Sequence, residues 1–265
     1  MNTAKWTLLS VLTLSIPAQA AVSTVHKDFN ATKINLLEVH SINGNIAVMP
    51  ETGDAISVDM TYDADKCEVT SEVRGKTVYL EATDKNKRRW FSFGTKDDYC
   101  AKFDIKAPAG MELKAVSVSG DIATERKSAP VSVETVSGDV NVSGPSGLEA
   151  NSVSGELKFS NAAGKIRLNT TSGGIIGGIS SSKEVKAHSI SGDIKLEFLK
   201  TPEKGELNLN TTSGDVSLIF PKGARAAAAL HSVSGEQKNN IINDPTSGLK
   251  ITATTVSGDT SIDGK

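Results

Sequence analysis

A short pattern of apolar and polar positions recurs along this chain and predicts its architecture. In residues 131–142 two apolar residues alternate with polar ones, then Thr135, Val136 and Ser-Gly-Asp follow, and a second alternating pair comes next. Period-two alternation indicates β-strands, because successive side chains point to opposite faces of a sheet. The change of phase between Thr135 and Val136 places a corner there, and Ser, Gly and Asp favour such a turn. Each copy is therefore expected to form strand, corner, strand and loop.

The pattern occurs eight times, with a degenerate ninth copy upstream at residues 37–46. Successive corner glycines are 17 to 23 residues apart, at Gly120, Gly138, Gly155, Gly173, Gly192, Gly214, Gly235 and Gly258. A fixed corner that returns about every twenty residues is typical of a solenoid, whose coils bury their faces only by stacking on one another. The sequence predicts an all-β fold, a β-solenoid (β-helix) of about eight to nine coils of 17–23 residues.

The chain before residue 111 departs from this repeat and divides into two parts. Residues 1–20 have a positive start, an apolar run and a small-x-small cleavage site, which predicts a signal peptide. Residues 21–110 hold the degenerate first coil and several alternating segments separated by turn residues, which predicts an antiparallel β cap over the N-terminal end. Residues 111–265 form the predicted solenoid.

Two cysteines and the leader point to the same compartment. Cys67 and Cys100 are the only cysteines, and in an oxidising compartment such a pair predicts a structural disulfide; a redox or metal pair would favour CxxC spacing or nearby histidines. The residue directly after the predicted cleavage site is Ala21 and not a cysteine, and no later stretch approaches ~18 consecutive apolar residues. We expect an exported protein, periplasmic or secreted, without a lipoprotein or transmembrane anchor.

The repeated Val/Thr-Ser-Gly-Asp-Ile/Val, each copy preceded by an alternating strand, together with the turns Pro108-Ala-Gly110 and Pro221-Lys-Gly223, resembles the DUF4097 family of β-strand repeat proteins. The resemblance covers about residues 35–263 and is strongest from residue 107 onward. It implies a β-solenoid and an adhesin-like role, as in the related head-domain adhesin-like families. It implies no catalytic residue.

Composition and motifs narrow the classes of function. The net charge of −2 gives no basic footprint for nucleic acid, and 5% aromatic content argues against a large enzyme cleft. The sequence has no nucleophile elbow, HExxH motif or phosphate-binding loop, so we expect no enzyme, no cofactor and no metal centre. A polysaccharide-active β-helix enzyme is the weaker alternative.

Three sets of equivalent positions in the repeat, which would form columns in a stack, could have a function. The acidic residues after each glycine suggest either a calcium ladder or turn-forming carboxylates; Gly174 interrupts the column, and the Ca²⁺-binding nonapeptide is absent. The hydroxyl residues three before each glycine suggest a flat binding face or a ladder that satisfies the corner. His188 and His231, two copies apart in the sequence, are expected about 10 Å apart, too far to share a metal.

The segment 85–94 is the least ordinary stretch. It combines basic and aromatic side chains, a composition suited to anionic glycans, lipid headgroups or a protein partner. The alternative is a hairpin whose aromatic rings pack onto the end of the solenoid. The candidate binding residues are Arg88, Arg89, Trp90, Phe91 and Phe93.

Two hypotheses of function follow. The first is recognition of an envelope protein or glycan through the basic aromatic segment or a face of the solenoid. The second is assembly, because the last coil has no evident cap and its edge could pair with another copy into a homo-oligomeric scaffold.

Overall fold

The computed structural model describes residues 22–85, 100–125 and 128–265, and in this part of the chain the structure consists of strands, turns and loops. The described residues contain no helix that could cross a membrane. The predicted signal peptide and the candidate binding residues 88–93 lie outside the described residues.

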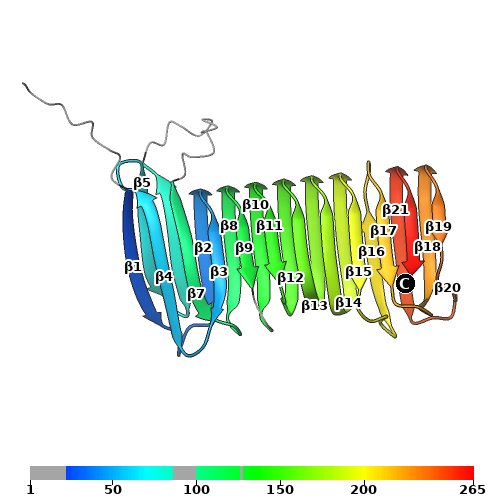
Figure 1. Ribbon diagram of the computed structural model, residues 1–265, viewed down its shortest axis with the longest axis horizontal. Coiled ribbons are helices and arrows are strands. Elements are labelled where there is room, and N and C mark those ends of the chain that lie inside the picture. Colours follow the sequence, from blue (N-terminus) through cyan, green and yellow to red (C-terminus); the bar gives the residue numbers. More distant parts are fainter. Residues whose placement is uncertain (1–21, 86–99, 126–127) are drawn as a thin grey trace, which may run out of the picture.

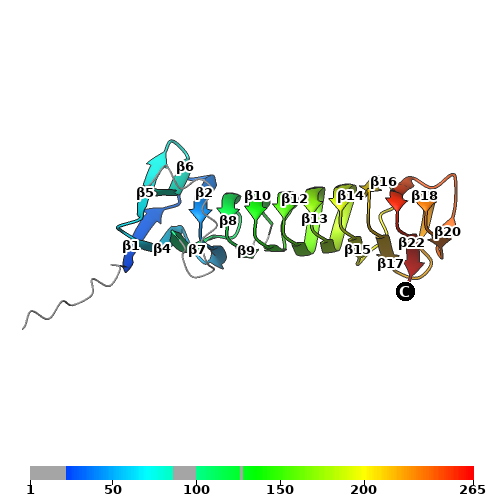
Figure 2. The ribbon, with the colours of Figure 1, turned by 90° about the horizontal axis from the view of Figure 1, so that it is seen from above.

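The strands form one long open sheet that folds into two facing layers, which Figure 2 shows as two rows. In spatial order the first layer contains β1 (Val22–Asn30), β4 (Ala55–Asp63), β7 (Ala101–Pro108), β3 (Ile46–Glu51), β9 (Ile122–Glu125), β11 (Val140–Ser143), the first halves of β13 (Leu157–Ser172) and β14 (Ile175–Ser191), β15 (Ile194–Phe198), β17 (Val216–Phe220), β22 (Thr260–Gly264) and β19 (Gln237–Asn239). The second contains β5 (Cys67–Arg74), β6 (Thr77–Asp84), β2 (Leu36–Asn43), β8 (Glu112–Ser119), β10 (Pro130–Ser137), β12 (Gly147–Ser154), the second halves of β13 and β14, β16 (Gly205–Asn210), β21 (Leu249–Ser257), β18 (Arg225–Ser234) and β20 (Ile242–Asn243). The predicted all-β class is confirmed, and the chain forms a solenoid-like stack (Figure 1).

The apolar residues of the alternating pairs fill the space between the two layers. Val131 and Val133 of β10 are buried, as are Val140 and Val142 of β11 on the facing layer. Their parallel register brings each onto the equivalent residue of the neighbouring strand, so every coil shares its buried surface with the next. Burial contributes about 25 cal/mol per Å² of apolar surface removed from water, and this stacking supplies it.

The corner between the layers lies later than the change of apolar phase indicates. Strand β10 continues through Ser137, so Thr135 points inward and Val136 points outward, with 47% of its surface exposed. The turn itself is Ser137-Gly138-Asp139, after which Val140 points inward again. The predicted tripeptide is correct, but the apolar residue before it faces solvent.

The corner glycines stack on one another so closely that no other residue fits. Gly138 has φ of +145°, which L-residues rarely adopt, and a Cβ atom there would approach the Gly120 carbonyl oxygen to less than 3.0 Å. The same clash recurs between successive corner glycines along the stack. Gly44 of the degenerate copy belongs to this column, because Gly120 lies directly against it although the two are 76 positions apart in the sequence.

The parallel stack extends further toward the N-terminus than the motif does. Strand β6 pairs parallel with β2, and β7 pairs parallel with β3, although no Ser-Gly-Asp joins them. Among the strands of the described residues, only β1–β4, β4–β7 and β5–β6 are antiparallel. The region 47–110, expected to be an antiparallel sheet throughout, therefore contributes two strands to the parallel stack.

The disulfide is present and joins the two layers. Cys67 begins β5 in the second layer, and Cys100 directly precedes β7 in the first, with 5.6 Å between their Cα atoms. Both cysteines are buried.

The order along the chain and the order in space differ at the C-terminal end. The last strands of the chain, β21 and β22, lie between β16/β17 and β18/β19, as the red strands between yellow and orange in Figure 1 show. The stack thus ends at β18 and β19. The expectation that the final copy ends the stack is wrong, because its two strands are inserted before β18 and β19.

The outer edge of β18 at that end is covered rather than open. The Ile242 and Asp244 N–H groups donate to the Ala224 and Ala226 carbonyl oxygens along the outer edge of β18 (3.1 and 2.9 Å), and the Asn243 side chain accepts from the Ala228 N–H (3.1 Å).

The Gln237 amide continues this cover along β18. When its orientation is assigned from its partners, it donates to the Leu230 carbonyl (2.8 Å) and accepts from the Ser232 N–H (3.1 Å). These amides occupy backbone groups that another strand would otherwise pair with.

Replacing Gly138 with alanine tests the corner constraint. We expect Gly138→Ala to lower the free energy of unfolding by about 3 kcal/mol or more, because it combines an unfavourable φ with a backbone clash. Gly75→Ala is the matched control: Gly75 also has positive φ (+63°), but nothing lies within 4 Å of its Cβ position, so about 1 kcal/mol is expected. Urea unfolding followed by circular dichroism measures both, and equal losses would contradict the close-stacking argument.

Candidate functional site

A continuous row of exposed β-branched side chains runs along the corner edge of the second layer. Each member is the residue two before the corner glycine, which points outward because its predecessor points inward. In spatial order the row consists of Ile42, Val118, Val136, Val153, Thr171, Ile190, Thr212, Val256 and Val233. Seven of the nine are apolar, with exposed fractions from 39% at Ile42 to 83% at Val233. We call it the β-branched row.

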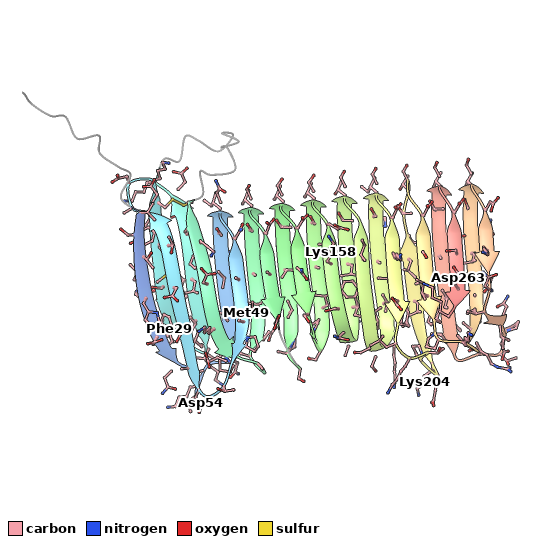
Figure 3. The ribbon with its side chains drawn as sticks, in the orientation of Figure 1. Phe29, Met49, Asp54, Lys158, Lys204 and Asp263 are labelled. Carbon is pink, nitrogen blue, oxygen red and sulfur yellow. A yellow bond between two sulfur atoms is a disulfide. The ribbon has the colours of Figure 1, made fainter. Side chains whose placement is uncertain are left out.

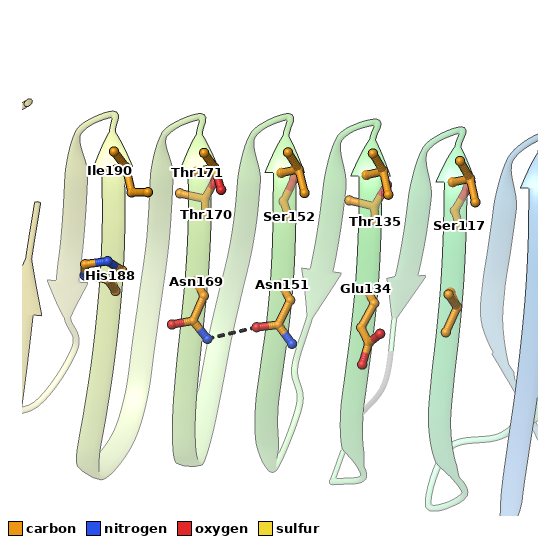
Figure 4. Close-up of a pocket in the computed structure, with 14 residues that line it drawn as sticks. Ser117, Glu134, Thr135, Asn151, Ser152, Asn169, Thr170, Thr171, His188 and Ile190 are labelled. Carbon is orange, nitrogen blue, oxygen red and sulfur yellow. Dashed lines mark hydrogen bonds between the residues drawn. The ribbon is translucent and has the colours of Figure 1, made fainter. Parts of the chain in front are cut away.

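A shallow groove of about 350 Å³ lies beside the β-branched row and crosses β8, β10, β12, β13 and β14 (Figure 4). One wall is the β-branched row from Val118 to Ile190. The opposite wall consists of Val116, Glu134, Asn151, Asn169 and His188, and the floor includes Ser117, Thr135, Ser152 and Thr170. The groove is straight because parallel strands in register place equivalent residues side by side.

The wall facing the β-branched row carries hydrogen-bonding side chains. The Asn169 Nδ2 atom donates to Asn151 Oδ1 across neighbouring strands (2.8 Å), as the dashed line in Figure 4 shows. Glu134 and His188 flank this pair on the adjoining strands. Each amide retains further donor and acceptor capacity, so the wall can make polar contacts from β10 to β14, whereas Val116 makes it apolar on β8.

The hydroxyl column beneath the groove belongs to the corner, not to a flat binding face. At the C-terminal end the hydroxyls of Thr211, Thr255 and Ser232 donate to glycine carbonyls of the adjoining corners, at 2.7–3.1 Å. The equivalent floor hydroxyls are buried and make no hydrogen bond. Because they occupy the same column, the glycine carbonyl of the adjoining corner is the acceptor that lies nearest in kind to those of Thr211, Thr255 and Ser232.

The acidic column is also structural. The Asp121 Oδ1 atom accepts from the Asp139 N–H (2.9 Å), and Asp139 Oδ1 accepts from the Glu156 N–H (2.8 Å). The same ladder runs from Asp193 through Asp215 and Asp259 to Glu236. These bonds explain why stacked carboxylates tolerate one another, because each accepts a backbone N–H from the next strand.

The two glutamates mark where this ladder stops. Beyond Glu156 comes Gly174, and Glu156 instead pairs with Lys158 (2.6 Å), which is labelled in Figure 3. Glu236 lies on the last coil in space. Aspartate occupies positions where the carboxylate bonds the next strand, and glutamate those where it does not.

The histidines do not form a metal site in the described residues, where no three His, Cys, Asp or Glu side chains group suitably. His188 and His231 are three strands apart, about 14 Å, rather than the expected two, because β21 is inserted between them. His40 bonds Glu38 through Nε2 (2.9 Å).

A histidine with two carboxylate partners, which the repeat could not reveal, joins β1 to β4. The His26 Nδ1 atom is 2.7 Å from Asp59 Oδ1, and Nε2 is 3.3 Å from Asp28 Oδ2. These carboxylates raise the pKa of His26, first through the Asp59 hydrogen bond and then through Asp28. The group is exposed and joins two antiparallel strands that carry no repeat motif.

The described residues on either side of the candidate binding residues 88–93 lie at the corner edge. Strands β6 and β7 stack on β2 and β3, so β6 ends and β7 begins at the edge where Ser-Gly-Asp corners join the later strands. The Cys100 N–H donates to the Asn43 carbonyl (2.7 Å), as the Gly44 N–H does to Ser119 (2.8 Å). These flanking residues therefore lie at the same edge that carries the β-branched row.

Comparison with known proteins concerns nearly the whole chain. The family model described as "Toastrack DUF4097" matches residues 34–263. The crystal structure of a "putative adhesin" from Bacteroides fragilis is 15% identical with a TM-score of 0.50, covering 92% of this chain and 97% of that chain. A "putative lipid binding protein" from Parabacteroides distasonis is also 15% identical with a TM-score of 0.50, covering 91% and 96%. No curated protein matches. At this identity the solved structures show likeness of fold alone.

Replacing Asp139 tests whether the acidic column is structural. Asp139→Ala removes the acceptor for the Glu156 N–H, and we expect a loss of about 1 kcal/mol in the free energy of unfolding. Asp139→Asn keeps Oδ1 and should stay within a few tenths of a kcal/mol of the wild type. Thermal unfolding with and without Ca²⁺ completes the test. A melting temperature that rises with Ca²⁺ in the wild type but not in Asp139→Ala would indicate a cation ladder instead.

Proposed function

The chain belongs to the Toastrack DUF4097 family, and from this premise we propose that it is an exported, non-enzymatic, adhesin-like binding module of the bacterial cell envelope. The observation that carries the proposal is the β-branched row with its groove. An exposed apolar surface of this length, bordered by polar side chains, is typical of an interaction site. The leader at residues 1–20 supports export, to the periplasm or beyond it.

Support for a binding role rather than catalysis comes from how the polar groups are used. The carboxylates of the acidic column bond backbone N–H groups, and the column hydroxyls lie under the corner. Residues engaged in this way hold the stack together. The β-branched row and its groove remain exposed and can contact a ligand along the length of the stack.

In this proposal the stack has about eight to nine coils, and both of its ends are covered. The antiparallel strands β1, β4 and β5 serve as the N-terminal cap, and the Cys67–Cys100 disulfide ties β5 to the first layer. The return segment at residues 236–248, with Gln237 and Asn243, covers the other end.

Binding to isolated envelope membranes tests the proposed function. We expect Val136→Lys/Val153→Lys to weaken binding about tenfold or more, because both side chains are half exposed on the β-branched row and their replacement places charge at the contact. Ile176→Lys, on the outer face of the first layer and 42% exposed, is the matched control. Equal binding by all three proteins would contradict a role for this face.

The basic aromatic segment is tested in the same assay. Arg89→Ala/Trp90→Ala is expected to weaken binding if Arg88, Arg89, Trp90, Phe91 and Phe93 contribute to recognition, and a variant lacking residues 85–94 should do the same. Unchanged binding by both variants would leave the face of the stack as the recognition surface and remove the segment from it.

The assembly alternative makes a separate prediction about the covered end. We expect the protein to be monomeric by light scattering, and Gln237→Val/Asn243→Val to associate with rising concentration, because these changes release backbone groups of β18. A wild-type protein that already forms dimers or longer stacks would favour the scaffold.

A further inference from the structure

We propose that the groove binds a neutral, linear, β-linked glycan laid along the stack, with one sugar ring to each coil. The inference rests on the proposed binding function and names the chemical class of its ligand. It follows from four properties of the groove: its straightness, its repeat, the pairing of apolar with polar contacts, and its charge.

The groove has the same two walls on five successive strands, and on three of them an apolar side chain faces a polar one. Each strand places a member of the β-branched row on one wall and a residue of the opposite wall across from it. Val136 faces Glu134, Val153 faces Asn151, and Ile190 faces His188. Because parallel strands lie ~4.8 Å apart, the ligand must offer an apolar and a hydrogen-bonding contact at that interval.

Two other linear ligands fit this pattern less well. An acyl chain matches the β-branched row, but the donors and acceptors that Asn151 and Asn169 do not use in bonding each other would face hydrocarbon, which is costly. An extended polypeptide repeats its side-chain direction every two residues, about 6.7 Å, and so loses register with the coils after a few strands.

A β-linked pyranose chain offers the required combination. The axial C–H groups of each ring form an apolar face for the β-branched row, and the equatorial hydroxyls lie at the ring edge. Hydroxyls both donate and accept, and therefore suit amides that keep both capacities free. In an extended chain of this kind one ring spans roughly the ~4.8 Å that separates neighbouring strands.

The charge of the groove favours a neutral glycan. Glu134 is the one carboxylate among its lining residues, and no lysine or arginine lines it. The outward row on the adjoining position carries three cations, Lys114, Arg167 and Lys186, and the carboxylate Glu149. Two of these cations already have carboxylate partners outside the groove, since Lys114 pairs with Glu38 (3.0 Å) and Arg167 lies 3.9 Å from Glu184. An anionic polymer in the groove would meet the Glu134 carboxylate, whereas no cation lines the groove itself.

Calorimetric titration with N-acetylated chito-oligosaccharides of one to six rings tests the inference. We expect affinity to rise with each ring and to level off at about five, the number of strands that the groove crosses. Val136→Lys/Val153→Lys should weaken binding of the longest oligosaccharide about tenfold or more, and Ile176→Lys should leave it unchanged. Circular dichroism confirms that the variants are folded.

The outcomes distinguish a failure of the glycan inference from a failure of the proposed function. Affinity that does not depend on ring number, or that falls equally in Ile176→Lys, overturns the inference. Binding of lauric acid or of an extended Thr-Val peptide without any binding of oligosaccharide overturns it as well. If the protein binds envelope membranes through the β-branched row but no oligosaccharide, the ligand class fails and the proposed function stands. If oligosaccharides bind but membranes do not, the inference stands and the proposed function fails.

Discussion

The close approach of one corner glycine to the next is the constraint on which the rest of the structure depends. A carbonyl oxygen occupies the space where a side chain would begin, as at Gly120 and Gly138. Because neither corner can shift without a clash, the strands on both sides are held in register. Equivalent residues then fall into columns, and each column has a single environment along the stack. A mismatch at one corner would displace buried and exposed columns together.

The columns explain how one repeat satisfies burial, hydrogen bonding and charge at once. Apolar pairs face the interior, and the hydroxyl column lies where a neighbouring glycine carbonyl can accept, as Thr211 and Thr255 show. The aspartates hold the next backbone N–H, which is why like charges can stack at the strand spacing. What remains for function is the outward surface, and its chemistry is repeated along a line rather than gathered in a cleft.

Much of the fold could be predicted from the sequence because the pattern reports local geometry. The alternation, the Ser-Gly-Asp corner, the Cys67–Cys100 bond and membership of the degenerate copy all depend on neighbouring residues or on the repeat itself. The parallel pairing of β6 and β7 could not be predicted in this way, because those strands lack the corner motif. The groove was missed because Val136 and its equivalents were placed at the corner, although regular alternation from Val133 already points them outward.

The inserted last coil shows that the sequence also held a signal for spatial order. A corner aspartate accepts the N–H of the next coil in space, whereas glutamate occupies positions where no such bond is made. Glu236 is followed along the chain by another full copy, so a coil with a glutamate corner appears in the middle of the sequence. A glutamate corner does not by itself fix the end, because Glu156 lies within the stack beside Gly174. Glu236 nevertheless suits the last position, where no further corner needs an acceptor, and Asp259 lies inside, where its carboxylate accepts the Glu236 N–H. The corner residues thus match the order in space rather than the order along the chain.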